Sequence, residues 1–422
     1  MGLRTRAVVL GAVASVVAAG CNNKVAAPPP PVCSAPQGSS AAAQSLASGD
    51  TAFAVGMFAP AVAAAGAGQN VIVSPYSVSA TLTMVDVGAA GDTDSQIQSA
   101  LSLTGNGAAI APAYAALACQ DETDGTTNGG VLSIANSLWG QQGTAFESTF
   151  LSVLASGYEA PLQQVDFQTD PNAAVSSINS WVSARTQGEI PTLLQPGDVD
   201  PTTRLVLVDA VYFKGTWATG FDASQTAPKP FTLADGTPAS VPTMDATVTL
   251  GEGSVQGAAI YELPYKGNGL AMDFVLPTGS LSAYEATLTP ASLGALVASL
   301  GSPEGGVELL LPKFSFTTSL GLIPILQGLG VRDLFEPHVA NLSGMDGGMD
   351  LFVSAVVQQA IVEVDESGTV AAAATAATVT SASVVEEPPL VAIDRPFLFL
   401  IRDTRNGSIL FMGQVEDPRQ GS

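Results

Sequence analysis

Helix-like segments gather in the amino-terminal third of this chain, and strand-like segments dominate the rest. Helical spacing of apolar residues begins at Asp50, at Ser74-Pro75 (through residue 87) and at Asp92 (through residue 101). Two more helices are expected at 171–185 and 320–329. The strand-like runs are 131–139, 205–213, 261–265, 270–276, 307–316, 351–364 and 396–415. This order predicts an α+β fold with more than one sheet.

The chain is strongly acidic. It carries 14 Lys and Arg against 37 Asp and Glu, a formal net charge of −23, and its few basic residues are not clustered. Such a surface repels phosphate backbones, so we expect neither nucleic acid nor heparin as a partner. The single histidine, His338, excludes zinc sites of the HExxH type, and no CxxC motif replaces them. We therefore expect no metal and no other cofactor.

The amino terminus resembles an export signal. Arg4 and Arg6 precede an apolar run at 7–17, and small residues stand directly before Cys21. Residues 1–20 are similar to a bacterial lipoprotein signal with Cys21 as the lipidated residue, and plain secretion is the alternative. The Pro-, Ala- and Ser-rich residues 21–47 are typical of an extended tether. We expect a cell-envelope lipoprotein or a secreted protein that touches a membrane only through this lipid.

An exported compartment permits disulfides. If Cys21 is lipidated, Cys33 and Cys119 remain, and they either pair or stay free thiols.

The common catalytic motifs are missing, and the chain is predicted not to be an enzyme. There is no GxSxG elbow, no SxxK with its partner motifs and no GxxxxGK[ST] loop. The glycines at 251, 253 and 257 favour a turn over a dinucleotide-binding loop. The polar stretch with Asp121, Asp124 and Asn128 favours a solvated loop over a cation site. His338 favours a loop histidine over a general base.

A long run of small residues follows the strand-like segment 351–364. From Ser367 to Ser383 the chain contains almost only Ala, Thr, Val, Ser and Gly. Such a run is typical of a flexible linker, but either face of it can be buried without large steric cost. It therefore also suits a loop that is exposed in one state and enters a sheet in another.

Eight motifs together resemble the serpin family over nearly the whole globular part. They are NVIVSPYS (70–77), SIANSLW (133–139), INSWV with TQGEI (178–190), LVDAVYFKGTW (207–217), LPKF (311–314), DLF (333–335), NLSG (341–344) and FMG (411–413). The resemblance implies a serpin domain at 48–418 with three β-sheets, eight or nine helices and an exposed reactive loop at about 366–389. It also implies a monomer.

The resemblance further implies a mechanism based on conformational energy. A serine protease attacks the loop, forms its acyl-enzyme and is trapped when the freed loop inserts into the main sheet. The hinge of the loop must then be small and flexible. This expectation fits Glu366, Gly368, Thr369, Val370, Ala371, Ala372, Ala373 and Ala374. Such a hinge favours an inhibitor over a non-inhibitory serpin that serves as a binding module or chaperone.

The position of the scissile bond depends on the reference point. Counting seventeen residues from Glu366 gives the bond between Ala382 and Ser383, whereas counting back from Pro396-Phe397 gives a position near Val385, with Val384 between them. All of these residues are small or aliphatic. They predict an elastase-like or subtilisin-like target rather than a trypsin-like one.

Two sets of residues match positions that control insertion in the family. The shutter comprises Ser74, Ser77, Asp209 and Gln358; the family usually has Asn and His where this chain has Asp209 and Gln358. We expect Asp209 and Gln358 to share a hydrogen bond, at the cost of burying a carboxyl group. The breach comprises Trp217, Lys313 and Glu366, and we expect a Lys313–Glu366 ion pair that helps to hold the loop out of the sheet.

Overall fold

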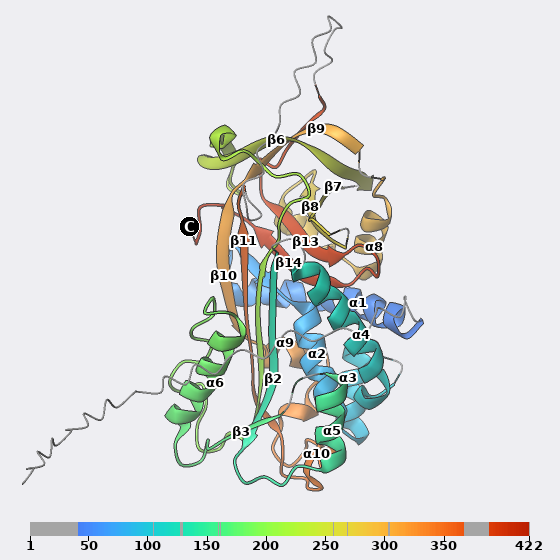
Figure 1. Cartoon of the computed structure of the whole chain (residues 1–422), viewed down its shortest axis with the longest axis vertical. Helices are drawn as coiled ribbons and strands as arrows, with labels where there is room; N and C mark the ends of the chain where they lie inside the picture. Colours follow the sequence, from blue (N-terminus) through green and yellow to red (C-terminus); the bar gives the residue numbers. More distant parts are fainter. Residues whose placement is uncertain are drawn as a thin grey trace, which may run out of the picture. The chain divides into compact units, whose positions relative to one another are not determined.

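The structure is a computed structural model that describes residues 41–103, 105–126, 130–158, 160, 162–255, 257–267, 269–302, 304–366 and 388–421. All of them belong to one compact unit that spans residues 32–422. The α+β class is confirmed (Figure 1). No helix of the described residues is long and apolar enough to span a lipid bilayer.

Ten α-helices lie in the described residues, one or two more than expected. They are α1 (Ala41–Ala65), α2 (Pro75–Asp86), α3 (Gly91–Leu101), α4 (Gly107–Thr126), α5 (Ser148–Gly157), α6 (Pro171–Arg185), α7 (Leu281–Glu285), α8 (Pro290–Ala298), α9 (Ile323–Gly328) and α10 (Ser343–Asp346). The helices α5, α7, α8 and α10 were not predicted from the sequence, and α7 and α10, with five and four residues, are too short to show a helical period.

The expected solvated loop around Asp121 is wrong. Asp121 lies in α4, and its side chain is fully buried. The many alanines of α4 favour a helix, but Pro112 and a nearly uniform distribution of apolar residues hide the amphipathic period. Burial, together with the neighbouring Asp403, raises the pKa of Asp121 well above its usual range.

The strands form two hydrogen-bonded sheets. One has five strands in the order β10-β11-β4-β2-β3, and the other has nine, in the order β1-β14-β13-β8-β7-β6-β9-β12 with β5 on β6. The strands are β1 (Val71–Val73), β2 (Val131–Gln141), β3 (Gln163–Val165), β4 (Leu205–Lys214), β5 (Ala227–Thr232), β6 (Pro238–Val255), β7 (Ala258–Pro264), β8 (Leu270–Pro277), β9 (Glu304–Pro312), β10 (Phe314–Gly321), β11 (Val353–Val364), β12 (Leu390–Ala392), β13 (Phe397–Asp403) and β14 (Ile409–Val415).

The three expected sheets appear as two because β6 joins two of them. Residues 243–250 of β6 pair with β9, and residues 251–255 pair with β7. Gly251 and Gly253 therefore lie in a strand, and the expected turn at these residues is wrong. The residues of β6 do not themselves indicate where its pairing changes from β9 to β7.

Two predicted strands are each two strands in the structure. The run 307–316 divides at Lys313 into β9, which pairs with β6, and β10, which pairs with β11. The run 396–415 divides into the antiparallel pair β13 and β14. The first division matters for the site, because it places Lys313 where the chain passes from one sheet to the other.

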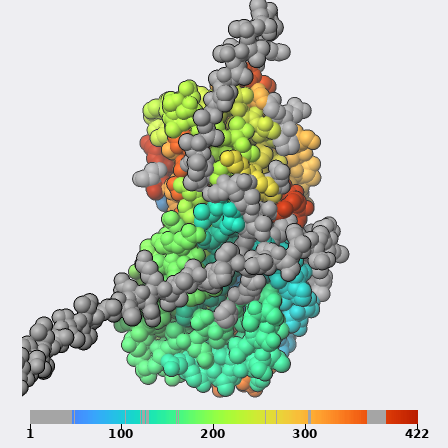
Figure 2. All heavy atoms as spheres, viewed as in Figure 1, coloured from blue at the N-terminus to red at the C-terminus, as the bar shows by residue number. Residues whose placement is uncertain are grey.

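Both faces of the five-stranded sheet are covered at β4. Ile178 and Val182 of α6 pack with Val206 and Val208 of β4 in one buried cluster. The alternate residues of β4, such as Leu207, belong to the larger core that includes α2. Figure 1 shows α6 and α2 on opposite sides of the strands, and Figure 2 shows that residues of about 150–200 occupy the lower part of the visible face. Asp209 therefore faces α2.

Candidate functional site: the seam between β4 and β11

Two neighbouring strands at the centre of the five-stranded sheet, β4 and β11, run parallel to each other. β11 pairs directly with β4 from Val353–Leu205 to Val362–Phe213. The next element after β11 in the chain is separated from it by residues 367–387, which lie outside the described residues. A strand that folded back from the end of β11 would run antiparallel to both β11 and β4. We call this pairing the seam.

The breach lies at the carboxyl-terminal end of β4 and β11, which is the upper end of the seam in Figure 1. Its predicted ion pair is present. Lys313 Nζ lies 2.6 Å from Glu366 Oε2. Thr226 Oγ1 donates to Glu366 Oε1 at 2.7 Å. The indole Nε1 of Trp217 donates to the carbonyl oxygen of Asp365 at 3.0 Å, and the amide of Phe221 donates to the carbonyl oxygen of Glu366 at 3.2 Å. Neither Thr226 nor Phe221 was predicted from the sequence, because both lie in segments without a motif.

These contacts set the charge of Glu366. Partial burial by itself would raise the pKa of Glu366, but hydrogen bonds from Lys313 and Thr226 outweigh it and lower that pKa below its ordinary value of 4.5. At neutral pH the Glu366 carboxylate is therefore ionised. Its bonds fix the position of Glu366, the residue at which the expected reactive loop begins.

A second ionic contact crosses the seam and was also not predicted. Lys214 Nζ on β4 lies 2.7 Å from Glu363 Oε1 on β11 and 3.3 Å from Asp365 Oδ2. Burial alone would lower the pKa of Lys214, but the two carboxylates raise it. Because its partners lie on the opposite strand, this contact must break if the strands separate.

The shutter lies at the centre of the seam, and here Gln358 bonds to the backbone of a helix. Gln358 Nε2 donates to the carbonyl oxygen of Ser74 at 2.9 Å, and Gln358 Oε1 accepts from the Ser74 amide at 3.1 Å. Ser74 is the N-cap of α2, and its hydroxyl accepts from the Ser77 amide. Gln358 therefore ties β11 to the start of α2.

Asp209 reaches the same helix one turn further along. Asp209 Oδ1 accepts from Thr81 Oγ1 at 2.9 Å and lies 3.1 Å from Ser77 Oγ. Asn136 on β2 completes the group, with its Oδ1 2.5 Å from Ser77 Oγ. The expected hydrogen bond between Asp209 and Gln358 is therefore replaced by separate bonds to α2, although the two residues are register partners. Burial raises the pKa of Asp209 to about 7, against the lowering effect of Thr81 and Ser77.

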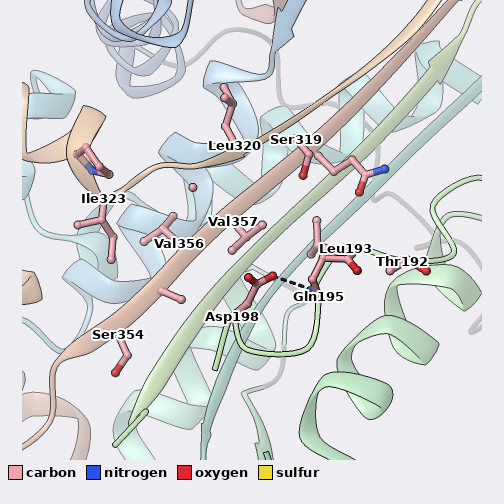
Figure 3. A pocket seen from close by; sticks show the side chains of 14 residues that line it. Thr192, Leu193, Gln195, Asp198, Ser319, Leu320, Ile323, Ser354, Val356 and Val357 are labelled. Atoms are coloured by element: carbon pink, nitrogen blue, oxygen red, sulfur yellow. Dashed lines mark hydrogen bonds between the residues drawn. The ribbon is translucent and has the colours of Figure 1, made fainter. Parts of the chain in front are cut away.

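A cavity of about 600 Å³ lies at the lower end of the seam. One wall is the segment 192–198, which leads into β4, and the other walls are β10, β11 and the start of α9. Figure 3 shows Leu193 and Asp198 close to Val357 of β11, with the bond from the Gln195 amide to Asp198 Oδ2 at 2.7 Å. The segment 192–198 therefore lies beside the outer face of the sheet where an additional strand would pass.

Several predicted residues lie outside the described residues. They are Cys21, the hinge residues Gly368, Thr369, Val370, Ala371, Ala372, Ala373 and Ala374, and the candidate scissile residues Ala382, Ser383, Val384 and Val385. Their roles stay predictions. Cys119 of α4 is disulfide-bonded, and the chain contains only Cys21 and Cys33 besides it.

The other candidate sites are not brought into the seam. His338 lies in a turn at positive φ (63°), and its exposed Nδ1 is 3.3 Å from Asp350 Oδ1. In the part of the chain that the structure describes, no three His, Cys, Asp or Glu side chains are grouped so as to hold a metal ion.

Comparisons with known proteins agree with this arrangement. A family profile described as "Serpin (serine protease inhibitor)" matches residues 48–418. The chain is 38% identical to the "Leukocyte elastase inhibitor" of Bos taurus, with 89% of this chain and all of that protein covered. It is 37% identical to "Serpin B9" of Homo sapiens, with 83% and 93% covered.

A prokaryotic relative and a solved structure are also similar. The "Uncharacterized serpin-like protein" of Methanosarcina acetivorans is 35% identical, with 83% of this chain and 82% of that protein covered. The "Crystal structure of native protease nexin-1 with heparin" is similar with a TM-score of 0.77 at 30% identity, and it covers 89% of this chain and 100% of that chain.

Proposed function

Because the chain belongs to the serpin family, we propose that it traps a serine protease as a suicide substrate, with residues from about 366 to 389 as its reactive loop. Serpins are protease inhibitors rather than enzymes, and this chain is one of them. The proposal concerns the mechanism, the target and the place of action.

The observation that carries the mechanism is the parallel seam. β4 and β11 are direct neighbours, and the chain that leaves β11 at Glu366 can only fold back antiparallel to both. Insertion would replace one parallel pairing by two antiparallel pairings, which are slightly more stable for each residue. Small hinge residues would enter such a gap with little steric resistance.

The path of the inserted strand ends beside the cavity at the lower end of the seam. The segment 192–198 has to yield there, because it connects α6 to β4 and lies against β11. Thr192, Gln195 and Asp198 of this segment are exposed, whereas Leu193 and Leu194 are buried and bonded to the Asn179 side chain of α6, so the segment would move together with α6 or break these bonds.

The loop sequence supports an elastase-like or subtilisin-like target. Cleavage between Ala382 and Ser383, or at Val384 or Val385, would present a small or aliphatic side chain to the protease. No Lys or Arg occurs from 367 to 387, so a protease pocket with an acidic floor has no partner in the loop. The name of the bovine relative points to the same class of protease.

We propose that heparin plays no part in this activity. The relatives include a protein whose structure contains heparin. In this chain, however, α4 contains no Lys, Arg or His. The net charge of −23 would repel a polyanion as well.

The place of action is proposed from the cysteines. If Cys21 carries a lipid, only Cys33 is left to pair with the disulfide-bonded Cys119. The serpin would then be held at the cell envelope through about eleven residues between the lipid and the disulfide, a reach of roughly 35–40 Å if extended. Mass spectrometry of tryptic peptides would test this: a Cys21–Cys119 peptide pair would exclude the lipid and favour plain secretion.

The function is tested by incubating residues 22–422 with pancreatic elastase, subtilisin and trypsin. We expect an adduct at the summed mass that survives boiling in detergent with the first two, and a released peptide that begins at Ser383 or within three residues after it. Trypsin should form no such adduct at this loop. The matched control is Ala372→Arg, which places a charge in the hinge and should convert the inhibitor into a substrate that is cleaved without an adduct.

Cleavage of the wild type without an adduct and without a gain in thermal stability would contradict the mechanism. The binding-module alternative would then be preferred.

A further inference from the structure

Asp209 is a carboxyl group in a buried and uncharged environment. It lies at the centre of β4, and its side chain has no exposed surface. The groups that face it are Ser77 and Thr81 of α2, Asn136 of β2 and Gln358 of β11. None of them is charged, and the charged residues nearest along the strands, Lys214 and Glu363, lie five positions from Asp209 and Gln358 towards the breach. Among the residues that the structure describes, no cation is therefore placed to compensate an ionised Asp209.

The hydrogen-bond partners of Ser77 indicate which protonation state of the Asp209 carboxyl group fits this site. Asn136 Nδ2 donates to the carbonyl oxygen of Ser77, so Asn136 Oδ1 faces the Ser77 hydroxyl, at 2.5 Å. An amide oxygen only accepts, and a hydroxyl has one proton. Ser77 therefore donates to Asn136, and its contact with Asp209 Oδ1 at 3.1 Å is a hydrogen bond only if the carboxyl group supplies the proton.

The ionised form fits less well. Ser77 would have to turn its proton from Asn136 to Asp209, which leaves the Asn136 amide oxygen without that donor. Among the described residues no donor reaches Asp209 Oδ2 at all. A buried carboxylate with one unbonded oxygen and no cation is strongly disfavoured.

We propose that a neutral Asp209 acts as a proton-controlled latch of the seam, and that loss of its proton promotes the separation of β4 from β11. Separation would admit water to the carboxyl group and allow it to ionise as in solution. This inference rests on the proposed insertion mechanism only for its effect on trapping, because the protonation itself requires no protease.

The expected pH dependence follows from the difference between the closed and the open seam. Burial raises the pKa of Asp209 from 3.8 to about 7 in the closed state, and exposure to water returns it towards the ordinary value. The proton on Asp209 stabilises the closed seam fully at acid pH. This stabilisation is lost as the pH rises through the pKa that Asp209 has in the closed state. Opening should therefore accelerate up to about pH 7 and become constant above it.

Hydrogen exchange of the β4 and β11 amides measures this directly, without protease. The wild type is compared with Asp209→Asn at each pH, so that the intrinsic pH dependence of exchange cancels. We expect the ratio of wild-type to variant exchange in these strands to rise roughly ten- to thirtyfold from about pH 5.5 to about pH 8, because the opening equilibrium changes about tenfold for each pH unit between the two pKa values. The asparagine retains an acceptor oxygen for Thr81 and cannot titrate.

The matched control is Asp50→Asn. Asp50 is another buried acid whose pKa burial raises to about 7, but it lies on α1 and its side-chain partner is Ser79. Its substitution should leave the ratio for β4 and β11 unchanged. A ratio that is flat across this pH range, or that changes equally with Asp50→Asn, overturns the proposal.

Infrared difference spectra give the protonation state itself. The wild type minus Asp209→Asn spectrum should contain a carboxylic acid C=O band at about pH 6 that disappears towards about pH 8. Absence of this band at the lower pH also overturns the latch. Failure to trap a protease would contradict the proposed function and leave both of these results unaffected.

Discussion

The breach and the shutter close the same seam with different chemistry. At the breach, Glu366 is held by Lys313 and Thr226 through side chains that are partly exposed to water. At the shutter, Gln358 binds the backbone of Ser74, and Asp209 binds hydroxyl groups of α2, all of them buried. The first arrangement depends on charge, and the second depends on complete pairing of neutral polar groups.

This difference assigns different roles to the breach and the shutter. Partly exposed ion pairs contribute little to stability and are screened by salt, so the breach can release the loop readily. Buried polar groups are expensive to leave unpaired, so the shutter resists separation of the strands until α2 also yields. We therefore expect the shutter to determine the barrier and the breach to determine where opening begins.

The largest effect should come from Gln358→Ala. This change removes both bonds to Ser74 and leaves the buried Ser74 amide unpaired at the start of α2, whereas the Ser74 carbonyl oxygen keeps its bond from the Val78 amide. We expect the free energy of unfolding to fall by about 2–4 kcal/mol. Denaturant unfolding of the native protein, followed by circular dichroism, measures it.

Gln359→Ala is the matched control for that variant. Gln359 is the next residue of β11, is half-buried and lines the cavity on the other face of the strand. Its substitution should change the free energy of unfolding by less than about 1 kcal/mol. Equal losses for the two variants would mean that strand packing, and not the bond to α2, stabilises the centre of the seam.

A smaller effect is expected for Glu366→Ala at the breach. Loss of the bonds from Lys313 and Thr226 should accelerate conversion to an inactive, loop-inserted form by roughly three- to tenfold. Conversion is followed as loss of protease-trapping activity on mild heating. An unchanged rate would remove the ion pair from control of the loop.

The pH and salt dependence of that variant sharpens the test. The pKa of Glu366 is lowered in the loop-exposed form, so its bonds stabilise that form fully when the pH is above the ordinary pKa of 4.5. This stabilisation is lost as the pH falls through the lowered pKa. The difference between wild type and Glu366→Ala should therefore shrink at acid pH and at high salt. A difference that persists under both conditions would contradict an ionic breach.

The smallest effect is expected for Lys214→Met. The substitution keeps the length of the side chain and removes its ion pairs with Glu363 and Asp365 across the seam. Such partly exposed pairs contribute about 0–1 kcal/mol, so conversion should accelerate by no more than about fivefold. Lys229→Met, which removes the Lys229–Asp245 pair away from the seam, should leave the rate unchanged.

Much of the fold was predictable because its signals are local. The start of α2 at Ser74-Pro75 combines an N-cap serine with a proline at the first helical position, and α6 has the predicted bounds 171–185. The long apolar runs of β4 and β11 appear as predicted, within two residues at each end. The division at Lys313 was missed, because consecutive strands without a turn signal look continuous in sequence, and β6 was not predicted at all, because its glycines at 251 and 253 favoured a turn.

The sequence predicted several residues of the candidate site, but not most of the partners they bind. The family resemblance indicated Ser74, Ser77, Asp209 and Gln358, but Thr81 lies outside the motifs, and Asn136, although it lies in the motif at 133–139, was not assigned to the shutter. The breach likewise included Lys313 and Glu366 and omitted Thr226. In each case the missed residue is an ordinary polar side chain that matters only because of its neighbour.

The sequence by itself determined the order of elements, the acidic charge, the small residues after Glu366 and membership of a family with a known architecture. These are properties of single residues and of short spacings along the chain. Only the tertiary structure decided that Gln358 binds Ser74, 284 positions away, and that Asp209 binds Ser77, 132 positions away. The partners of a buried polar group depend on which side chains folding brings within about 3 Å, and no local pattern encodes that distance.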